Sequence, residues 1–513
     1  MLLNSTLAIK KLINNSKNPA LLKIYTNYSN VNKKISYAIT ESNTAINIDS
    51  LINISNKIEK EMISMVQLEN QISQNNVQFD EIRNSLSENE AVIEFVNFNY
   101  YNNGWTDSTF YCALVIKKEL EHPEIVYLFE EKQMKKLLYR NPELDKKYAD
   151  KNPEYYYVKS LYQNKKNQVD ISDSIYQITW KPIDYLLKNV KNVYISPSGI
   201  LNQIAFDAIP YNDSLILSDV YSIDYVSNSS KIKSKKSLNF SDIKDVALFG
   251  GIQYDMDTTM MKIVAGKYQK PDDIFISSIS SSRSINLDSN ITSRGVVWQN
   301  LEDTIAETEN IETLFSNKNI STKLFSGTEA TEEVFKSFSN NSPTVMHIAT
   351  HGFYFPEDNK FKNSDLFSEN LQFTNSKDPL MRSGILLAGG NKVWTGGKIP
   401  DNIQDGVLSA YEVSQLNLLN TKLVVLSACQ TGLGDFVGNE GVYGLQRAFK
   451  IAGVDYLIVS LWQVPDATTQ ELMQDFYKYW LQGSPINQAF KLAQNDLKKK
   501  YSAYGWAAFV LIY

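Results

Sequence analysis

The chain has 513 residues, of which 43% are hydrophobic and 21% are charged. This composition is that of a globular protein and excludes a chain that is mostly disordered. The length is enough for about two to four domains. The 51 basic and 57 acidic residues leave a net charge of −6, which does not favour binding to nucleic acid or to a membrane surface.

Cysteine and histidine are scarce in this sequence. Two cysteines cannot form a disulfide framework, and three histidines leave little for a metal site. Polar residues interrupt the apolar run of the opening MLLNSTLAIKKL, so no signal peptide is expected. The most apolar stretches are far shorter than the roughly 20 residues of a membrane helix. We therefore expect a cytoplasmic protein without a metal, a cofactor or a membrane segment.

The first part of the chain has the pattern of helices, and the next part has that of strands. Residues 1–88 are rich in Asn, Ser and Lys, with apolar residues at helical intervals, and predict a helical N-terminal segment. From Ala91, short β-branched and aromatic runs such as AVIEFVNF and TFYCALVIK predict an α/β region. Residues 252–300 have few periodic apolar positions and predict a long flexible connection.

A second α/β region surrounds and follows this connection. We expect helices over LEDTIAETENIETLF, Val442–Ala452 and Ala467–Leu481, and strands over VALFG, TKLFS, TVMHIATHG, SGILLAGG, TKLVVLSACQTG and DYLIVSLW. The unbroken apolar character of VVLSA and YLIVSLW is typical of parallel strands that are covered by helices on both faces. In such sheets a ligand binds at the carboxyl ends of the strands.

Two polar motifs stand at the ends of predicted strands. His351-Gly352 follows VMHIAT, and Cys429 follows KLVVLSA. A thiolate is the nucleophile of covalent acyl transfer, and a histidine on a neighbouring strand can take its proton. Gly352 has no side chain, so its N–H can approach a reacting carbonyl and form an oxyanion hole with the N–H of Cys429.

Each of these residues also has a structural interpretation. Cys429 would be a small buried hydrophobic residue and His351 a hydrogen-bonded histidine, but their pairing beside glycine favours catalysis. Cys112 has apolar neighbours on both sides and is expected to be an inert core cysteine. His122 precedes Pro123 and is expected in a turn.

A metal site and a nucleotide site are weaker interpretations. His347 and His351 have the i, i+4 spacing of a zinc helix, but on a strand that spacing separates them by about 13 Å. The glycines at 432, 434 and 438 miss the dinucleotide pattern by one residue, and no phosphate-binding P-loop occurs. A nucleotide-dependent enzyme stays open as a disfavoured third interpretation.

The stretch from His347 to Tyr513 resembles the CHAT-domain peptidases, relatives of caspases and separases. The matching blocks run in order: HIATHGFY, SGILLAGG, GVLSAYEV, LVVLSACQTGLG, GNEGVYGLQRAFKIAGVDYLIVSLWQVPD and YGWAAFVLIY. The resemblance implies His351 as general base and Cys429 as nucleophile. The segment NVYISPSGILNQIAFDAIP is similar to the inactive first half that such proteins commonly carry.

The resemblance implies an α/β fold with a caspase-like, mostly parallel sheet flanked by helices. The expected parts are a helical segment (1–88), an inactive pseudo-caspase half (89–245) and an active peptidase half (246–513). The implied function is that of a cysteine endopeptidase that cleaves a protein and is activated by a protein partner or a signal. The alternative is an interaction module of the same fold whose dyad is unused.

The residues that bind the substrate are less clear from the sequence. Trp462 and Asp466 follow the strand YLIVSLW, and we expect them to line the specificity pocket. Capping of the helix that follows is the favoured interpretation of Asp466, and in that case the loop around Trp394 is the next candidate. Glu440 could organise the active-site loop or could interact with the dipole of the helix predicted from Val442.

Overall fold

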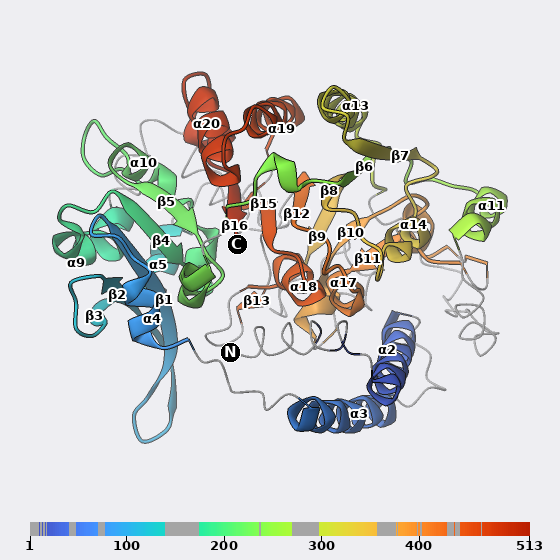
Figure 1. Ribbon diagram of the computed structural model, residues 1–513, viewed down its shortest axis with the longest axis horizontal. Coiled ribbons are helices and arrows are strands. Elements are labelled where there is room, and N and C mark those ends of the chain that lie inside the picture. The colour runs from blue at the N-terminus through green and yellow to red at the C-terminus, as the bar shows by residue number, and fades with distance from the viewer. Residues whose placement is uncertain are drawn as a thin grey trace. The chain divides into compact units, whose positions relative to one another are not determined.

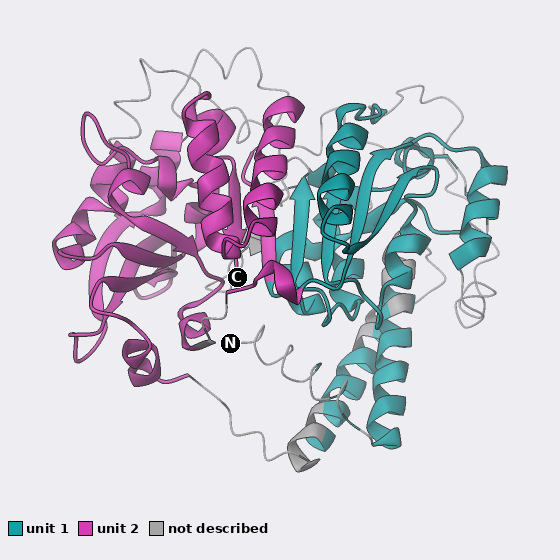
Figure 2. Cartoon of the chain, turned by 45° about the horizontal axis from the view of Figure 1, so that its top comes forward, with its two compact units in different colours: residues 1–75, 243–435, 444–455 teal, residues 76–242, 436–443, 456–513 magenta. Residues whose placement is uncertain are grey.

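The computed structural model describes two compact units, each built from separate stretches of sequence (Figure 2). Unit 1 contains residues 1–75, 243–435 and 444–455, and unit 2 contains residues 76–242, 436–443 and 456–513. The residues described are 10, 13, 16, 18–40, 48–69, 77–138, 174–234, 237–268, 297–355, 376, 378–397, 399–400, 403–427, 435–436, 442–462 and 464–513. Every structural statement below refers to these residues.

Unit 1 contains a parallel sheet. Its strands lie in the order β12 (Leu423–Ser427), β8 (Val345–Ala349), β6 (Asp245–Ile252) and β7 (Ser321–Gly327) (Figure 1). All residues of β8 and β12 are buried, as their unbroken apolar runs predict for parallel strands covered on both faces. A second, antiparallel sheet has the order β11 (Val407–Ser409), β10 (Ser383–Leu386) and β9 (Gly352–Tyr354).

Helices complete unit 1. They are α2 (Pro19–Thr40), α3 (Ile48–Glu69), α11 (Thr258–Tyr268), α13 (Asp303–Ser316), α14 (Glu332–Ser337), α16 (Asn391–Trp394), α17 (Ala410–Gln415) and α18 (Leu445–Ala452), with the 3₁₀ turn η7 (Pro379–Arg382). Of these, α13 packs against β6 and β7. The short strand β13 (Asp435–Phe436) lies where the sequence passes from unit 1 to unit 2.

Unit 2 contains a mixed sheet. Its strands lie in the order β3 (Glu124–Glu130), β2 (Trp105–Lys117), β1 (Glu90–Tyr101), β4 (Asn192–Ser196), β5 (Ser222–Tyr225), β16 (Phe509–Ile512) and β15 (Tyr456–Ser460). The pairs from β1 to β16 are parallel, and the pairs at either end are antiparallel. Strand β16 thus pairs with β5 on one side and with β15 on the other.

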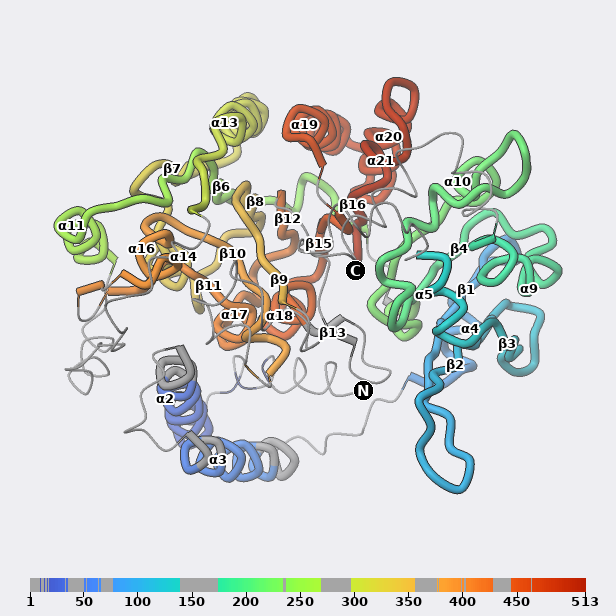
Figure 3. Tube along the Cα trace, turned by 180° about the vertical axis from the view of Figure 1, so that it is seen from behind, coloured from blue at the N-terminus to red at the C-terminus, as the bar shows by residue number. Residues whose placement is uncertain are grey.

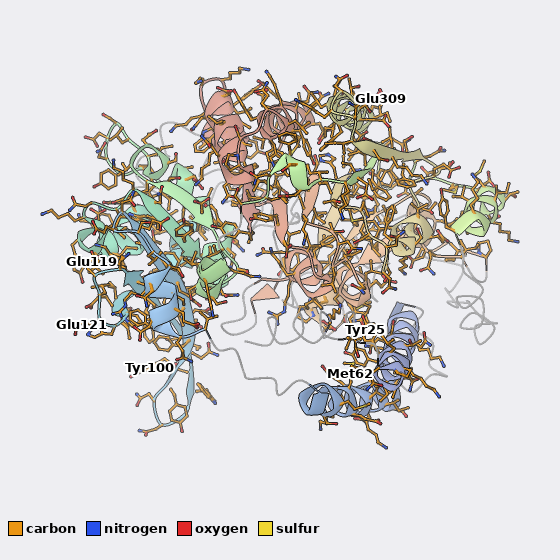
Figure 4. The ribbon with its side chains drawn as sticks, in the orientation of Figure 1. Tyr25, Met62, Tyr100, Glu119, Glu121 and Glu309 are labelled. Carbon is orange, nitrogen blue, oxygen red and sulfur yellow. The ribbon has the colours of Figure 1, made fainter. Side chains whose placement is uncertain are left out.

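The remaining elements of unit 2 are mostly short. Its helices are α4 (Phe79–Asn84), α5 (Glu131–Leu138), α9 (Lys181–Asp184), α10 (Leu217–Val220), α19 (Asp466–Leu481), α20 (Ile486–Lys498) and α21 (Ala503–Trp506), and its other elements are β14 (Val442–Tyr443), η1 (Tyr185–Leu187), η2 (Gly199–Gln203), η3 (Phe206–Ala208), η4 (Ser229–Ser234) and η5 (Phe240–Asp242). Glu119 and Glu121 mark the turn between β2 and β3, and Tyr100 lies near the tip of the β1–β2 hairpin (Figure 4). The predicted α/β class, with a mostly parallel sheet flanked by helices, is confirmed.

The predicted N-terminal helices are present as α2 and α3, which pack against each other (Figure 3). Leu21 of α2 and Met62 of α3 are buried in one apolar cluster. Lys10 Nζ donates hydrogen bonds to the carbonyl oxygens of Ser414 (2.8 Å) and Leu416 (3.1 Å) at the end of α17. Burial lowers the pKa of Lys10 to about 7. Side-chain contacts therefore join this N-terminal region to the rest of unit 1.

Charged side chains of α14 and α17 form a cluster in which Glu332 is buried and Lys336 is partly exposed. Lys336 Nζ lies 2.8 Å from Glu412 Oε1 and 2.5 Å from Glu332 Oε1. Burial raises the pKa of Glu332, and burial raises that of Asp405 to about 6. The pKa of Glu412 is lowered by Lys336 and by its hydrogen bonds with Ser409, which together outweigh its desolvation. Several carboxylates thus depend on one ammonium group.

The predicted flexible connection over residues 252–300 is wrong at both ends. At its beginning, residues 258–268 form α11, although their apolar residues show no regular period. At its end, Trp298 and Gln299 contact His351. The middle of this segment, 269–296, lies outside the described residues.

Candidate active site

His351 lies two residues beyond the end of β8, at the carboxyl edge of the parallel sheet of unit 1. Its backbone carbonyl accepts a hydrogen bond from the N–H of Leu386 at 2.9 Å. Its backbone N–H donates to the hydroxyl of Tyr254 at 3.3 Å. Both backbone polar groups are therefore bound, which fixes the point from which the imidazole projects.

The imidazole of His351 contacts two aromatic rings. The ring centroids of Tyr254 and Trp298 are 5.0 Å and 4.8 Å from that of His351. Nε2 lies 2.8 Å from the carbonyl oxygen of Gln299. A carbonyl can only accept, so Nε2 carries the hydrogen, and in the neutral ring Nδ1 carries the lone pair. The geometry selects the tautomer in which Nδ1 is the base.

Burial also sets the ionisation of His351. Desolvation lowers its pKa, and the hydrogen bond to the Gln299 carbonyl opposes this effect in part. A histidine with a lowered pKa is neutral over more of the physiological pH range and can accept a proton there.

A short chain of hydroxyl groups supports the backbone of His351. The Thr350 hydroxyl donates to the carbonyl of Leu386. Its proton is thereby used, so the hydroxyl of Tyr254, 2.9 Å from Thr350 Oγ1, is the donor in that contact. The oxygen of Tyr254 is then left to accept the N–H of His351. Tyr254 contacts the histidine through both its ring and its hydroxyl.

Gly352 is the first residue of β9 and is buried. In the ladder between β9 and β10, the His351/Leu386 and Phe355/Arg382 pairs are hydrogen-bonded. Hydrogen-bonded and non-hydrogen-bonded pairs alternate in an antiparallel ladder, so Gly352, opposite Ile385, is in a non-hydrogen-bonded pair. Its N–H therefore points away from β10, as a predicted donor to an oxyanion requires.

Cys429 and Glu440 lie in the ranges 428–434 and 437–441, which are outside the described residues. The strand before the cysteine is described, and it confirms that β12 and β8 are parallel neighbours. Their last residues, Ser427 and Ala349, are paired in register. In the sequence, His351 follows Ala349 by two residues, and Cys429 follows Ser427 by two. Helix α18 begins at Leu445, three residues later than the predicted start at Val442.

The two predicted substrate contacts belong to unit 2. Trp462 is 1% exposed, and its indole N–H donates to the carbonyl of Tyr504 at 2.8 Å. Asp466 is the exposed first residue of α19, and Pro465 occupies the N-cap position. The predicted capping role of Asp466 is therefore wrong by one position. Of the two residues, only Asp466 has an exposed side chain, so it is the one that we retain as a candidate substrate contact.

If the chain cleaves peptides and Asp466 contacts the substrate, Asp466→Asn is expected to change the preference between basic and apolar residues before the scissile bond, because the amide removes the charge and keeps the shape. The measurement is a cleavage profile on a peptide library. Asp303→Asn is the matched control, since Asp303 is likewise the exposed first residue of a helix. An unchanged profile would leave Asp466 as a helix-terminal charge and move the question to Trp394.

The remaining histidines and Cys112 have structural surroundings. His347 is fully buried on β8, with Nε2 2.9 Å from Glu307 Oε1, and the predicted strand there is confirmed. His122 is exposed in a turn. Cys112 is half-buried on β2, where desolvation raises its pKa, so it is not the fully buried cysteine that we expected. No group of three or more metal-ligating side chains occurs among the described residues.

The sequence analysis missed three residues that contact His351: Tyr254, Trp298 and Gln299. The two aromatic residues lie in a segment that the pattern assigned to a connection. A tryptophan in a segment with few periodic apolar positions was the available signal, because large aromatic side chains usually find a partner. Gln299 acts through its backbone carbonyl, which every residue has, so no residue type could have marked it.

Two curated proteins match a short stretch of the chain. A stretch of 114 residues is 35% identical to human tetratricopeptide repeat protein 28 and 33% identical to the mouse protein of that name. This stretch is 21% of the chain and 4% of either relative, so the chain spans a small part of their length.

Solved structures resemble the chain at low identity. The Arg-specific cysteine proteinase gingipain R is 10% identical, with a TM-score of 0.36 over 70% of this chain and 66% of the proteinase. The Saccharomyces cerevisiae separase in its complex with securin is also 10% identical, with a TM-score of 0.40 over 90% of this chain and 32% of separase. At these values no residue's role can be transferred.

Among the described residues, no helix is both long enough and apolar enough to cross a bilayer.

The model of the CHAT domain family matches residues 169–513, which is more than half of the chain. The matched region contains both strand-ending motifs, at His351 and at Cys429. The chain therefore belongs to the CHAT domain family.

Proposed function

We propose that this protein is a cysteine endopeptidase that cleaves a protein substrate through Cys429 and His351. The observation that carries the proposal is the hydrogen bond of 2.8 Å between Nε2 of His351 and the carbonyl of Gln299. It holds the imidazole by one nitrogen and leaves the other as a base. The register of Ala349 with Ser427 supports a dyad, because His351 and Cys429 each follow that pair by two residues.

The proposed reaction has two steps. His351 takes the proton of the Cys429 thiol, and the sulfur attacks the scissile carbonyl. The N–H groups of Gly352 and Cys429 hold the oxyanion. His351 then protonates the leaving amine, and an acyl-enzyme remains. In the second step His351 takes a proton from water, the hydroxide releases the acid, and the thiol is restored.

The test is alkylation of the two cysteines of the chain, in which the reaction of Cys112 serves as an internal reference for the reaction of Cys429. A free thiol has a pKa near 8.5. Alkylation of Cys429 by iodoacetamide is expected to begin at a lower pH than this, because the neutral imidazole of His351 can take the proton of the thiol. Cys112 should react slowly and only at higher pH, since burial raises its pKa. Peptide mass spectrometry follows the two sites separately across the pH range.

His351→Ala is expected to move the alkylation of Cys429 to higher pH and to leave that of Cys112 unchanged. Equal pH profiles for Cys429 in the native protein and in this variant would contradict the proposed dyad.

The direction in which proteolysis changes with pH follows from the lowered pKa of His351. Activity should rise with pH, with its acidic limb below the ordinary histidine value of about 6.5.

Proteolysis is expected to need no metal ion and no nucleotide. The described residues contain no group of metal ligands, and the sequence has no phosphate-binding loop. Adding EDTA should therefore leave the cleavage rate unchanged. Loss of activity in EDTA that zinc restores would reject the proposed mechanism.

The substrate and any activating partner are proposed to be proteins in the cytoplasm. The alternative is an interaction module whose dyad is unused. The alkylation experiment separates the two, because a module has no need of a reactive thiolate. Ordinary, slow alkylation at Cys429 in the native protein would favour the module.

A further inference from the structure

The side chain of Asn391 holds the backbone of a residue 93 positions earlier in the sequence. Its Oδ1 accepts the backbone N–H of Trp298 at 3.0 Å, and its Nδ2 donates to the Trp298 carbonyl at 2.9 Å. The side chain thus pairs with both polar groups of one residue, as a neighbouring strand would. Asn391 is 2% exposed, so the two bonds are shielded from water.

Trp298, which Asn391 holds, is next to the residue that binds the imidazole of His351. Gln299, whose carbonyl accepts Nε2 of His351, directly follows Trp298. Residues 297–300 belong to no helix or strand, so no regular backbone pairing holds this carbonyl in place. The indole of Trp298 packs against His351 on one side, and Trp394 of α16 packs against that indole with its centroid at 5.3 Å.

Asn391 also contacts the other support of the imidazole. Its backbone N–H donates to the carbonyl of Tyr254 at 3.1 Å. Tyr254 is the residue whose ring and hydroxyl both contact His351. One residue therefore contacts both neighbours of the histidine ring, through its side chain on Trp298 and through its backbone on Tyr254.

We infer that Asn391 is a positioning residue that fixes the orientation and the tautomer of His351 by holding the Gln299 carbonyl in place. An asparagine suits this role because its amide presents one acceptor and one donor side by side, matching a backbone C=O and N–H. Aspartate would keep the acceptor and lose the donor. Alanine would lose both and leave the backbone groups of Trp298 without partners.

The inference rests on the proposed function only in taking His351 as the base, and it can be tested without a substrate. The full chain has three histidines, so ring ¹⁵N signals of labelled protein can be assigned with His351→Asn. In the native protein, His351 should give the signals of a ring protonated at Nε2. In Asn391→Ala these should move towards a mixture of tautomers, with a changed titration midpoint. Asn391→Asp should give intermediate values.

The control is Asn32→Ala. Asn32 is 3% exposed and accepts a side-chain hydrogen bond from Ser55, between α2 and α3, so its loss matches the burial without touching the site. It should leave the signals of His351 unchanged. Alkylation of Cys429 should slow by about tenfold to a hundredfold in Asn391→Ala, since small misplacements of a catalytic group cost this much. If the alanine variant fails to fold, the aspartate variant decides.

Two results separate the inference from the proposed function. Unchanged ring signals in Asn391→Ala, or in Asn391→Asp if the alanine variant is unfolded, would overturn the positioning role, whether or not Cys429 is reactive. Changed ring signals together with a Cys429 whose reactivity never depended on His351 would uphold the positioning role and reject the peptidase mechanism.

Discussion

Alanine at Cys429 or at His351 is expected to abolish proteolysis while the chain still folds. Without the thiol no acyl-enzyme forms, and without the imidazole the thiol stays protonated, so each change should lower the rate by about a thousandfold or more. His351 lies beyond the end of β8 and not within its buried apolar run, so its loss removes little of the core. The measurement is cleavage of a proteome-derived peptide library, with thermal unfolding to verify the fold.

Cys112→Ala is the matched control, because it removes the other thiol of the chain from a half-buried position on β2. It should leave the cleavage rate as it is in the native protein. An active Cys429 variant together with an inactive Cys112 variant would reverse the proposed roles. If the native chain cleaves nothing with any partner present, the interaction module is the better description.

Of the substitutions proposed for this chain, Lys336→Met is expected to cause the largest loss of folding stability. It leaves Glu332, which is 1% exposed, and Glu412 without their shared cation. Removing one partner of a buried ion pair costs about 3 to 5 kcal/mol, and we expect the low end, about 3 kcal/mol, because the Lys336 side chain is 26% exposed. Urea denaturation of the full chain measures the difference. A change within error would show that the carboxylates find another cation or stay protonated.

The loss should depend on pH in a defined direction. The folded-state pKa of Asp405 is raised to about 6. The stability that comes from its protonation is therefore present at pH 4 and is lost as the pH rises through 6. Glu332 is shifted in the same direction. The buried carboxylates therefore need Lys336 most when they are ionised. The deficit of the variant should be larger at pH 8 than at pH 5, and a deficit that shrinks with rising pH would contradict this account.

Lys267→Met is the control for Lys336. Lys267 pairs with Glu329 at 2.5 Å, but both side chains are largely exposed, at 50% and 42%. Water and salt screen such a pair, and holding it in place costs side-chain entropy. Its removal should barely move the denaturation midpoint at either pH. A loss as large as that of Lys336→Met would mean that burial is not what makes the cluster matter.

What the sequence predicted well depends on local pattern. The apolar runs before His351 and Cys429 predicted two buried parallel strands, and β8 and β12 are such strands and neighbours. Helix α19 begins at Asp466, one residue before the predicted start, because Pro465 takes the cap position and leaves Asp466 within the first turn. Such end effects depend on backbone angles that residue patterns indicate only coarsely.

What the sequence could not predict depends on contacts between distant segments. Gln299 reaches His351 across 52 residues, and Asn391 reaches Trp298 across 93. Neither belongs to a periodic run, and asparagine is common in this chain, so its presence singles out no position. The same holds for Lys336, whose ion pair with Glu412 joins α14 to α17. Only the folded chain identifies these residues as partners.

The place of β16 in the sheet of unit 2 affects how the protein is made. Strand β5 ends at Tyr225, and its parallel partner β16 ends at Ile512. A ribosome that adds 5–20 residues per second needs roughly 15 to 60 s to synthesise the 287 residues between them. During that interval β5 presents unpaired backbone groups on one side, which another chain could join. The nascent chain should therefore depend on chaperones until β16 emerges, and slow codons late in the message should lower the yield of folded protein.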